Sequence, residues 1–167
     1  MKLPKLTAFC TIVLSLMILA GCDRDGEYDD RNVFRKFDLP INAAQEVPAN
    51  SSTAIGSLDV TYDRGTKTLT YTFSWSGLSG PAVAANIHGL AGKGALALPP
   101  PLGSFPNGII QTLWAPSAAR GTSGSYSGTL LVDEVLVKEI DLLAGKLYVN
   151  IVTPARPTGE IRGQIEF

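Results

Sequence analysis

The chain has 167 residues, of which 45% are hydrophobic, and it contains 17 glycines, 11 prolines and two cysteines. Its 14 Lys and Arg are balanced by 15 Asp and Glu, so the formal net charge is -1. Nucleic acid is therefore not expected as a partner, because phosphate binding needs a clustered basic face.

The N-terminal segment has the layout of a secretory signal. Lys2 and Lys5 give a positive start, and the almost continuous apolar run that follows is shorter than a typical membrane span. It ends in Leu19-Ala20-Gly21-Cys22, which resembles the bacterial lipobox, the site where a lipoprotein is cut and its cysteine acylated. This resemblance implies that residues 1–21 are a lipoprotein signal peptide and that Cys22 carries the lipid. The alternative is an ordinary signal peptide with an incidental cysteine.

The rest of the sequence divides into a tether and a domain. Residues 22–32 are acidic and contain no aliphatic side chain, so they are expected to stay solvated. Residues 33–167 contain ten basic and ten acidic residues, and their length suits one domain with its own core. Cys10 would leave with the signal, so Cys22 has no partner for an intramolecular disulfide. We expect a cell-envelope protein that a lipid anchor holds on a membrane, facing outside the cytoplasm.

A hydrophobic period of two is typical of strands and begins early in the domain. Large apolar residues alternate with hydroxyl residues from 69 to 76, which predicts a strand with one core face and one solvated face. A similar strand is expected at 58–62. Between them, Asp63-Arg64-Gly65-Thr66 is typical of a hairpin turn in which Gly65 takes positive φ, so the two strands should pair antiparallel.

Further strands complete the predicted fold, and a turn at 156–159 should precede the last of them. They are expected at 34–41, 83–89, 109–114, 125–132, 146–153 and 160–167. The expected fold is an all-β, antiparallel, Greek-key-like β-sandwich with one short helix.

Two segments interrupt the strand pattern. Four prolines in 98–108 cannot supply the donors of a sheet, which predicts a long exposed loop. In 133–145, helical spacing ends at Gly145, which is typical of a helix end, although two valines leave a strand open as the alternative. The residues at helical spacing are Leu136, Ile140 and Leu143.

Several blocks of the domain resemble one protein family. They are Ala44-Gln45-Glu46-Val47-Pro48, Leu78-Ser79-Gly80, Ala84-Ala85-Asn86-Ile87-His88-Gly89, Leu147-Tyr148-Val149-Asn150-Ile151-Val152-Thr153 and Gly159-Glu160-Ile161-Arg162-Gly163-Gln164-Ile165. In this order and spacing the blocks resemble the chordin-type domain, CHRD, over nearly the whole domain. The resemblance implies an all-β unit found in secreted and surface proteins, including bacterial ones and the growth-factor antagonist chordin. It implies no defined biochemical role.

The resemblance also bears on metal binding. Family members commonly read His-Ile-His-Gly at the third block and Asn-Val-His-Thr at the fourth. Residues two apart on a strand share a face, so this pattern would gather three imidazoles, a set suited to zinc or copper. Here Asn86 and Val152 stand at two of the three positions, and His88 is the single histidine of the chain. We therefore predict no metal site and no cofactor, and a structural role for His88.

Other polar residues share strand faces in the last two blocks. Glu160 and Arg162 are two residues apart, and so are Tyr148 and Asn150. A structural ion pair or a hydrogen-bond brace is the expected role of Glu160 and Arg162, with substrate orientation as the alternative. The candidate binding or structural polar cluster is Asn86, His88, Asn150, Glu160 and Arg162. No serine elbow or complete catalytic set is visible, so the chain is not expected to be an enzyme.

Three functions remain open at this point. The preferred one is a membrane-tethered module that binds an extracellular or envelope protein or polysaccharide through loops such as 98–108. The second is a divergent metal-binding protein, by analogy with the copper–zinc superoxide dismutase sandwich. The third is a purely structural envelope component without a specific ligand.

Overall fold

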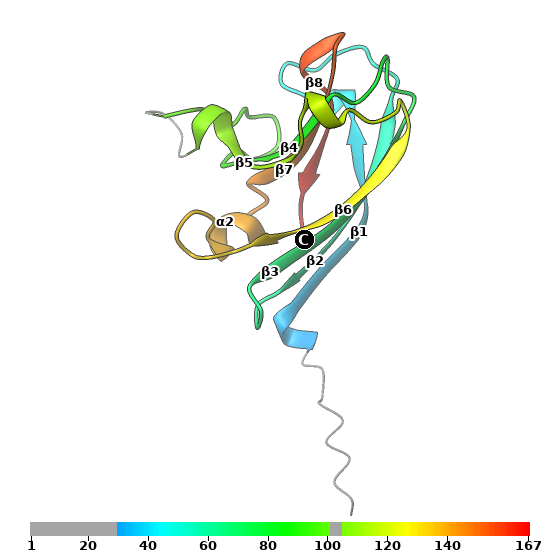
Figure 1. Ribbon diagram of the computed structural model, residues 1–167. Coiled ribbons are helices and arrows are strands. Elements are labelled where there is room, and N and C mark those ends of the chain that lie inside the picture. Colours follow the sequence, from blue (N-terminus) through cyan, green and yellow to red (C-terminus); the bar gives the residue numbers. More distant parts are fainter. Residues whose placement is uncertain (1–29, 101–104) are drawn as a thin grey trace, which may run out of the picture.

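The computed structural model describes residues 30–100 and 105–167 (Figure 1). The predicted signal peptide, Cys22 and nearly all of the tether lie outside these residues. No helix in the described part of the chain is long and apolar enough to cross a membrane. The strands are β1 (Val33–Asn42), β2 (Ile55–Asp63), β3 (Thr68–Ser76), β4 (Ala84–His88), β5 (Ile109–Trp114), β6 (Gly124–Leu131), β7 (Leu147–Thr153) and β8 (Arg156–Ile165). The helices are η1 (Asp30–Asn32), η2 (Ala43–Gln45), η3 (Pro106–Gly108), η4 (Pro116–Ala118) and α2 (Glu139–Leu143).

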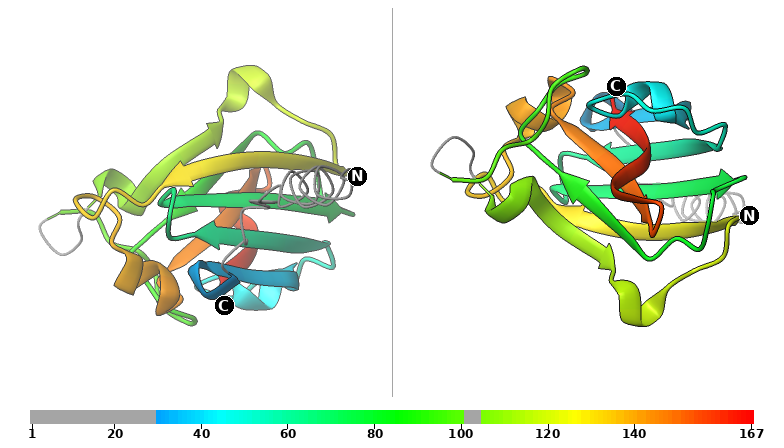
Figure 2. Two further views of the ribbon diagram at one scale, coloured as in Figure 1. Left: turned by 90° about the horizontal axis from the view of Figure 1, so that it is seen from below. Right: turned by 90° about the horizontal axis from the view of Figure 1, so that it is seen from above.

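The strands form one antiparallel sheet in the order β5-β4-β7-β8-β1-β2-β3-β6, which confirms the all-β antiparallel prediction. The sheet curls until it is nearly closed into a barrel, so that its two halves face each other as in a sandwich (Figure 2). Side chains bridge the gap between the edge strand β5 and the strands β3 and β6 at the other end of the sheet. The Tyr71 hydroxyl donates to Gln111 Oε1 at 3.1 Å, and Gln111 Nε2 donates to the Thr129 carbonyl at 3.1 Å.

The hydrophobic core fills the inside of the curled sheet. In β3 the large apolar residues are buried and the hydroxyl residues between them face outward, as the period of two predicts. Trp114 of β5 packs against Phe73 and Trp75 of β3, with ring centroids 6.1 and 5.4 Å away. Burial of each large side chain favours folding by about 1.5–3 kcal/mol. This aromatic cluster therefore stabilises the approach of the two ends of the sheet.

The β2–β3 hairpin has the predicted antiparallel pairing but a different turn. Positive φ occurs at Lys67, with φ 53°, and not at Gly65. The Asp63 carboxylate accepts the Gly65 N–H at 2.7 Å and so closes the first part of the turn. The residue with positive φ therefore lies two positions later in the chain than predicted.

Two loop predictions also need correction. β8 begins at Arg156, so the β7–β8 turn lies at residues 154–155 and not at 156–159. The proline-rich segment 98–108 stays out of the sheet, as predicted, but it is not exposed throughout its described residues. Phe105 is only 6% exposed and belongs to the core, because an aromatic side chain on a loop gains more by burial than by contact with water.

The predicted short helix exists as α2 and ends before Gly145, which has φ 66°. Its buried face differs from the prediction. Leu142 is fully buried, whereas Ile140 and Leu136 are 73% and 65% exposed. The Asp133 carboxylate accepts three backbone N–H groups of the residues that follow it, so this segment forms a compact loop before the helix.

Candidate functional site

The outer face of β4, β7 and β8 is polar, although their inner face, with residues such as Ile87 and Val149, belongs to the core. Its side chains come from aligned positions, since Asn86 pairs with Asn150 and Asn150 with Arg162 across the strands. Loops cover this face, so most of its polar side chains are buried. The buried ones are Asn86, Tyr148, Asn150, Glu160, Arg162 and Gln164.

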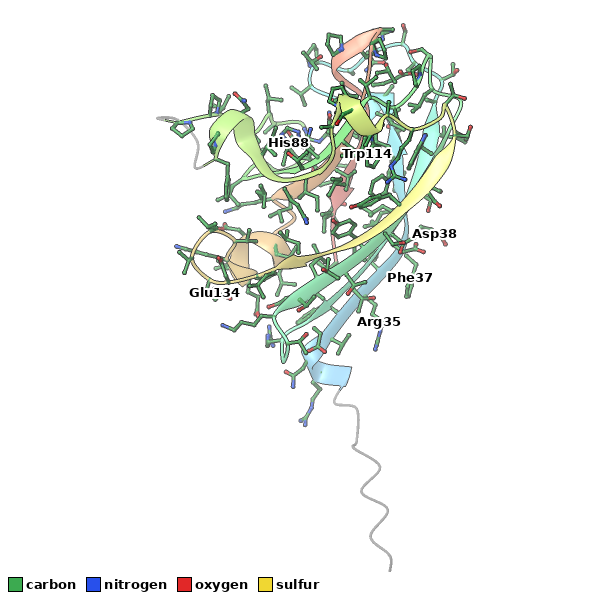
Figure 3. All side chains as sticks on the ribbon, in the orientation of Figure 1. Arg35, Phe37, Asp38, His88, Trp114 and Glu134 are labelled. Carbon is green, nitrogen blue, oxygen red and sulfur yellow. The ribbon has the colours of Figure 1, made fainter. Side chains whose placement is uncertain are left out.

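A pocket of about 520 Å³ lies between this polar face and the loops above it. Asn86, His88 and Asn150 line it, whereas Glu160 and Arg162 of the predicted cluster do not. His88 ends β4, opposite the first residue of β5 (Figure 3). The rest of the wall is mainly apolar and includes Val47, Pro48, Leu96, Pro99, Ile109 and Val152. The structure therefore brings together three of the five residues of the predicted polar cluster.

Tyr148 of β7 stands between His88 on β4 and Arg162 on β8. Its ring stacks on the imidazole with centroids 5.1 Å apart, and Arg162 Cζ lies 3.5 Å from the centroid of the Tyr148 ring. Burial lowers the pKa of His88 to about 4, helped by Arg162 and opposed by the Gly108 backbone. His88 is therefore neutral at pH 7, and its Nδ1 has no hydrogen-bond partner among the described residues.

Asn150 links the pocket to a buried carboxyl group. Its Nδ2 donates to Glu46 Oε1 at 2.9 Å and to the Thr158 carbonyl at 3.4 Å, while its Oδ1 has no partner among the described residues. Burial raises the pKa of Glu46 to about 7, although Arg162 and the Asn150 amide favour the ionised form. Gly159 leaves room for this pair, because a Cβ at that position would collide with Asn150 Nδ2.

Arg162 fastens the loop after β4 to the sheet. The residue is 1% exposed, and its Nη1 and Nη2 donate to the carbonyl groups of Ala95 and Gly92 at 2.7 and 3.0 Å. Nη2 also donates to Gln164 Oε1 at 2.6 Å, and Gln164 Nε2 donates to the Ala91 carbonyl at 2.9 Å. These bonds hold one wall of the pocket in place.

Glu160 holds a different set of segments. Its carboxylate is fully buried and accepts bonds from Ser52 Oγ, Ser79 N and Oγ, and Thr153 Oγ1 at 2.6 to 2.8 Å. Burial raises the pKa of Glu160, but these hydrogen bonds together lower it below its ordinary value. Of the two structural roles left open by the sequence, the geometry favours the brace, because the described ion pairs include none between Glu160 and Arg162.

Sequence reasoning did not find the role of Glu46 or the wall formed by Val47 and Pro48, although it singled out the 98–108 loop, which contributes Pro99 and Asn107 to the pocket. The bond between Asn150 and Glu46 joins residues 104 positions apart, and the bond between Ser79 and Glu160 joins residues 81 apart. No local pattern encodes such contacts. The family resemblance was the one sequence feature that pointed to these residues, because Glu46 and Ser79 both lie in blocks that resemble the family.

The family model of the CHRD domain matches residues 37–165. The chain belongs to the CHRD domain family. No curated protein and no solved structure matches the chain. The matched residues include seven complete strands, most of β1 and all the residues that line the pocket, so the CHRD domain is the curled sheet with its polar outer face. Membership points to an extracellular binding or interaction module.

In this CHRD domain, the three positions at which family members commonly have histidine all line the pocket. Asn86 and His88 point to the same side of β4, and Val152 pairs with Ala84 beside them. The three positions therefore lie together, as the resemblance implied, but Asn86 and Val152 stand beside His88 in place of two further histidines. The described residues contain no group of three His, Cys, Asp or Glu that could hold a metal ion. The donor set does not fit zinc or copper.

Proposed function

We propose that the protein is a lipid-anchored binding module of the bacterial cell envelope whose ligand enters the pocket on the outer face of β4 and β7. The pocket is the observation that carries the proposal. Its volume of about 520 Å³ lies within the range of about 300–1,000 Å³ that is usual for ligand sites. Its wall is mostly apolar, with a few amide groups that can orient a ligand.

The surroundings of the pocket support binding rather than catalysis. Arg162 holds the loop that carries Leu96 and Ala97 through buried hydrogen bonds, so this wall needs little ordering when a ligand arrives. Of the described residues that line the pocket, only His88 and Tyr148 carry titratable side chains. His88 stacks on Tyr148 and is held neutral by burial, an arrangement that suits packing and hydrogen bonding better than proton transfer near pH 7.

The proposed location follows from the N-terminal sequence. Lipidation of Cys22 would hold the domain at a membrane, outside the cytoplasm. The ten residues between Cys22 and Val33 would reach at most ~35 Å when extended. The domain would thus meet an envelope or extracellular protein or polysaccharide close to the membrane that carries it.

Photo-crosslinking in intact cells tests this proposal. A photoreactive amino acid replaces Asn107, an exposed residue that lines the pocket, and in a matched strain it replaces Thr70, an exposed residue of β3. We expect a crosslinked product from position 107 that position 70 does not give, and its loss when Cys22→Ala removes the anchor. Equal products from the two positions, or none from position 107, would contradict the proposal.

A further inference from the structure

The composition of the pocket wall indicates the kind of ligand. We infer that the pocket binds an uncharged, hydroxyl-rich ligand, namely a neutral sugar unit of a glycan. This inference rests on the proposed function, because it assigns the ligand class of the same site. Three observations carry it: the charge of the wall, two unpartnered polar atoms, and the pairing of the strands behind them.

The wall presents no full charge to a ligand at neutral pH. Among the described residues, no Lys, Arg, Asp or Glu lines the pocket, and the histidine that does, His88, is neutral. Arg162 lies behind Tyr148 and donates to backbone carbonyl groups, and Glu46 lies behind Asn150. A charged ligand group that loses hydration here meets no counter-ion on the described wall, which disfavours its binding.

Two polar atoms at the wall lack hydrogen-bond partners among the described residues, namely Asn150 Oδ1 and His88 Nδ1. Asn150 is only 4% exposed, so water does not readily reach its amide oxygen. The amide orientation is fixed, because Nδ2 already donates to Glu46 and to the Thr158 carbonyl. A buried acceptor of this kind is normally satisfied in a protein, so a ligand donor would gain a hydrogen bond there once neighbouring wall side chains shift to admit it.

A hydroxyl group is the ligand group that fits both atoms. It donates to the amide oxygen, and it donates to or accepts from the imidazole in either tautomer, whereas a carboxylate only accepts and an ammonium only donates. Asn86 and Asn107 bring two further amides to the pocket, and an amide matches a pair of neighbouring hydroxyls with one donor and one acceptor. Apolar residues such as Val152 and Leu96 suit the C–H faces of a sugar ring.

The strands behind the pocket disfavour a peptide. β4 pairs with β5 and β7, and β7 pairs with β4 and β8, so neither strand has a free edge for an added strand. β5, whose Ile109 also lines the pocket, is an edge strand, but its Gln111 side chain bridges it to the Thr129 carbonyl of β6. A peptide lying on the apolar wall would leave its own backbone groups unpaired, which disfavours its binding. The observations therefore favour a sugar over a protein segment.

Calorimetric titration of the mature lipoprotein, in a detergent without a sugar headgroup, tests the inference. The probes are neutral disaccharides of glucose, galactose, mannose and N-acetylglucosamine, each compared with its uronic acid and its amino-sugar counterpart. We expect at least one neutral disaccharide to bind at least tenfold more tightly than both charged counterparts. Val152→Trp, which fills the pocket, should weaken that binding at least tenfold, while Thr70→Trp on the opposite part of the sheet should leave it unchanged.

Three results would overturn the inference: no binding of any neutral disaccharide, equal binding of a charged counterpart, or binding that survives Val152→Trp. A circular-dichroism melt of Val152→Trp and Thr70→Trp shows whether each variant is folded, and the comparison of neutral with charged probes on the wild type needs no variant. If position 107 still crosslinks a partner while no neutral sugar binds, the proposed function stands and the sugar assignment fails. If neither occurs, both fail.

Discussion

Two buried titratable side chains, Glu46 and His88, give the polar face opposite responses to pH. Glu46 has a pKa of about 7 in the folded protein against an ordinary 4.5, so its contribution to stability is full below about pH 4.5 and is lost as the pH rises through 7. His88 has a pKa of about 4 against 6.5, so its contribution is full above about pH 6.5 and is lost as the pH falls through 4. Their effects oppose each other between pH 4.5 and 6.5.

Glu46→Gln separates these two effects. The glutamine keeps an oxygen for the Asn150 amide but carries no charge, so the variant should be more stable than wild type at pH 8 by roughly 3 kcal/mol. The difference should shrink towards pH 4.5, where Glu46 is protonated. Urea unfolding at pH 5 and pH 8 measures both values, with Glu166→Gln, at a partly exposed position, as control. Parallel pH profiles for wild type and Glu46→Gln would show that Glu46 does not titrate in this window.

Glu160→Gln should be strongly destabilising. An amide replaces one of the two oxygens that accept four bonds, and its NH₂ group then faces donors from Ser52, Ser79 or Thr153. We expect a loss of about 2–4 kcal/mol in the free energy of unfolding. Glu166→Gln removes an exposed ion pair with Lys93 and should change stability by less than ~0.5 kcal/mol. Equal losses in the two variants would refute the role of Glu160 as a brace.

At the scale of single elements, Leu142 is the buried apolar residue that anchors α2. Leu142→Ala should cost about 2–5 kcal/mol of unfolding free energy, because Leu142 is fully buried in the core. Ile140→Ala, on the same short helix, should change it by less than ~0.5 kcal/mol, since Ile140 is 73% exposed. Chemical denaturation of the two variants side by side measures this contrast. A larger loss for Ile140→Ala would mean that the sequence pattern chose the correct face after all.

The sequence predicted the strands well and the connections poorly. Alternation in β3 reports a physical period of two, so burial of Tyr71 and Phe73 follows from the pattern itself. In the turn that ends at Lys67, the Asp63 carboxylate accepts a backbone N–H. In the loop before α2, the Asp133 carboxylate does the same. The spacing of hydrophobic residues carries no information on such bonds.

The candidate site was predictable only in part. Its strand residues share a face by simple alternation, which placed Asn86 and His88 together and Glu160 with Arg162. Which of them would line a pocket depends on loops that pack over the sheet from distant parts of the chain. Glu46 reaches Asn150 in this way, and so does the Ala95 carbonyl that accepts from Arg162.

At the scale of the whole molecule, the N-terminal prediction is tested by the chemistry of the two cysteines. Cells are grown with an alkyne-bearing fatty acid, and the label on the protein is then detected. We expect label on the wild type and on Cys10→Ala, because Cys10 would be removed with the signal, and no label on Cys22→Ala. Label that persists on Cys22→Ala, or none on the wild type, would contradict a lipid anchor at Cys22.

The central claim is that the pocket over β4 and β7 is where this CHRD domain binds. The most direct measurement is chemical crosslinking capture from intact cells with the lipidated wild type, Val152→Trp and Thr70→Trp, expressed at equal levels. Filling the pocket should abolish the specific product, and the bulky residue on β3 should leave it intact. A product that is equally abundant in all three strains would place the binding surface elsewhere on the molecule.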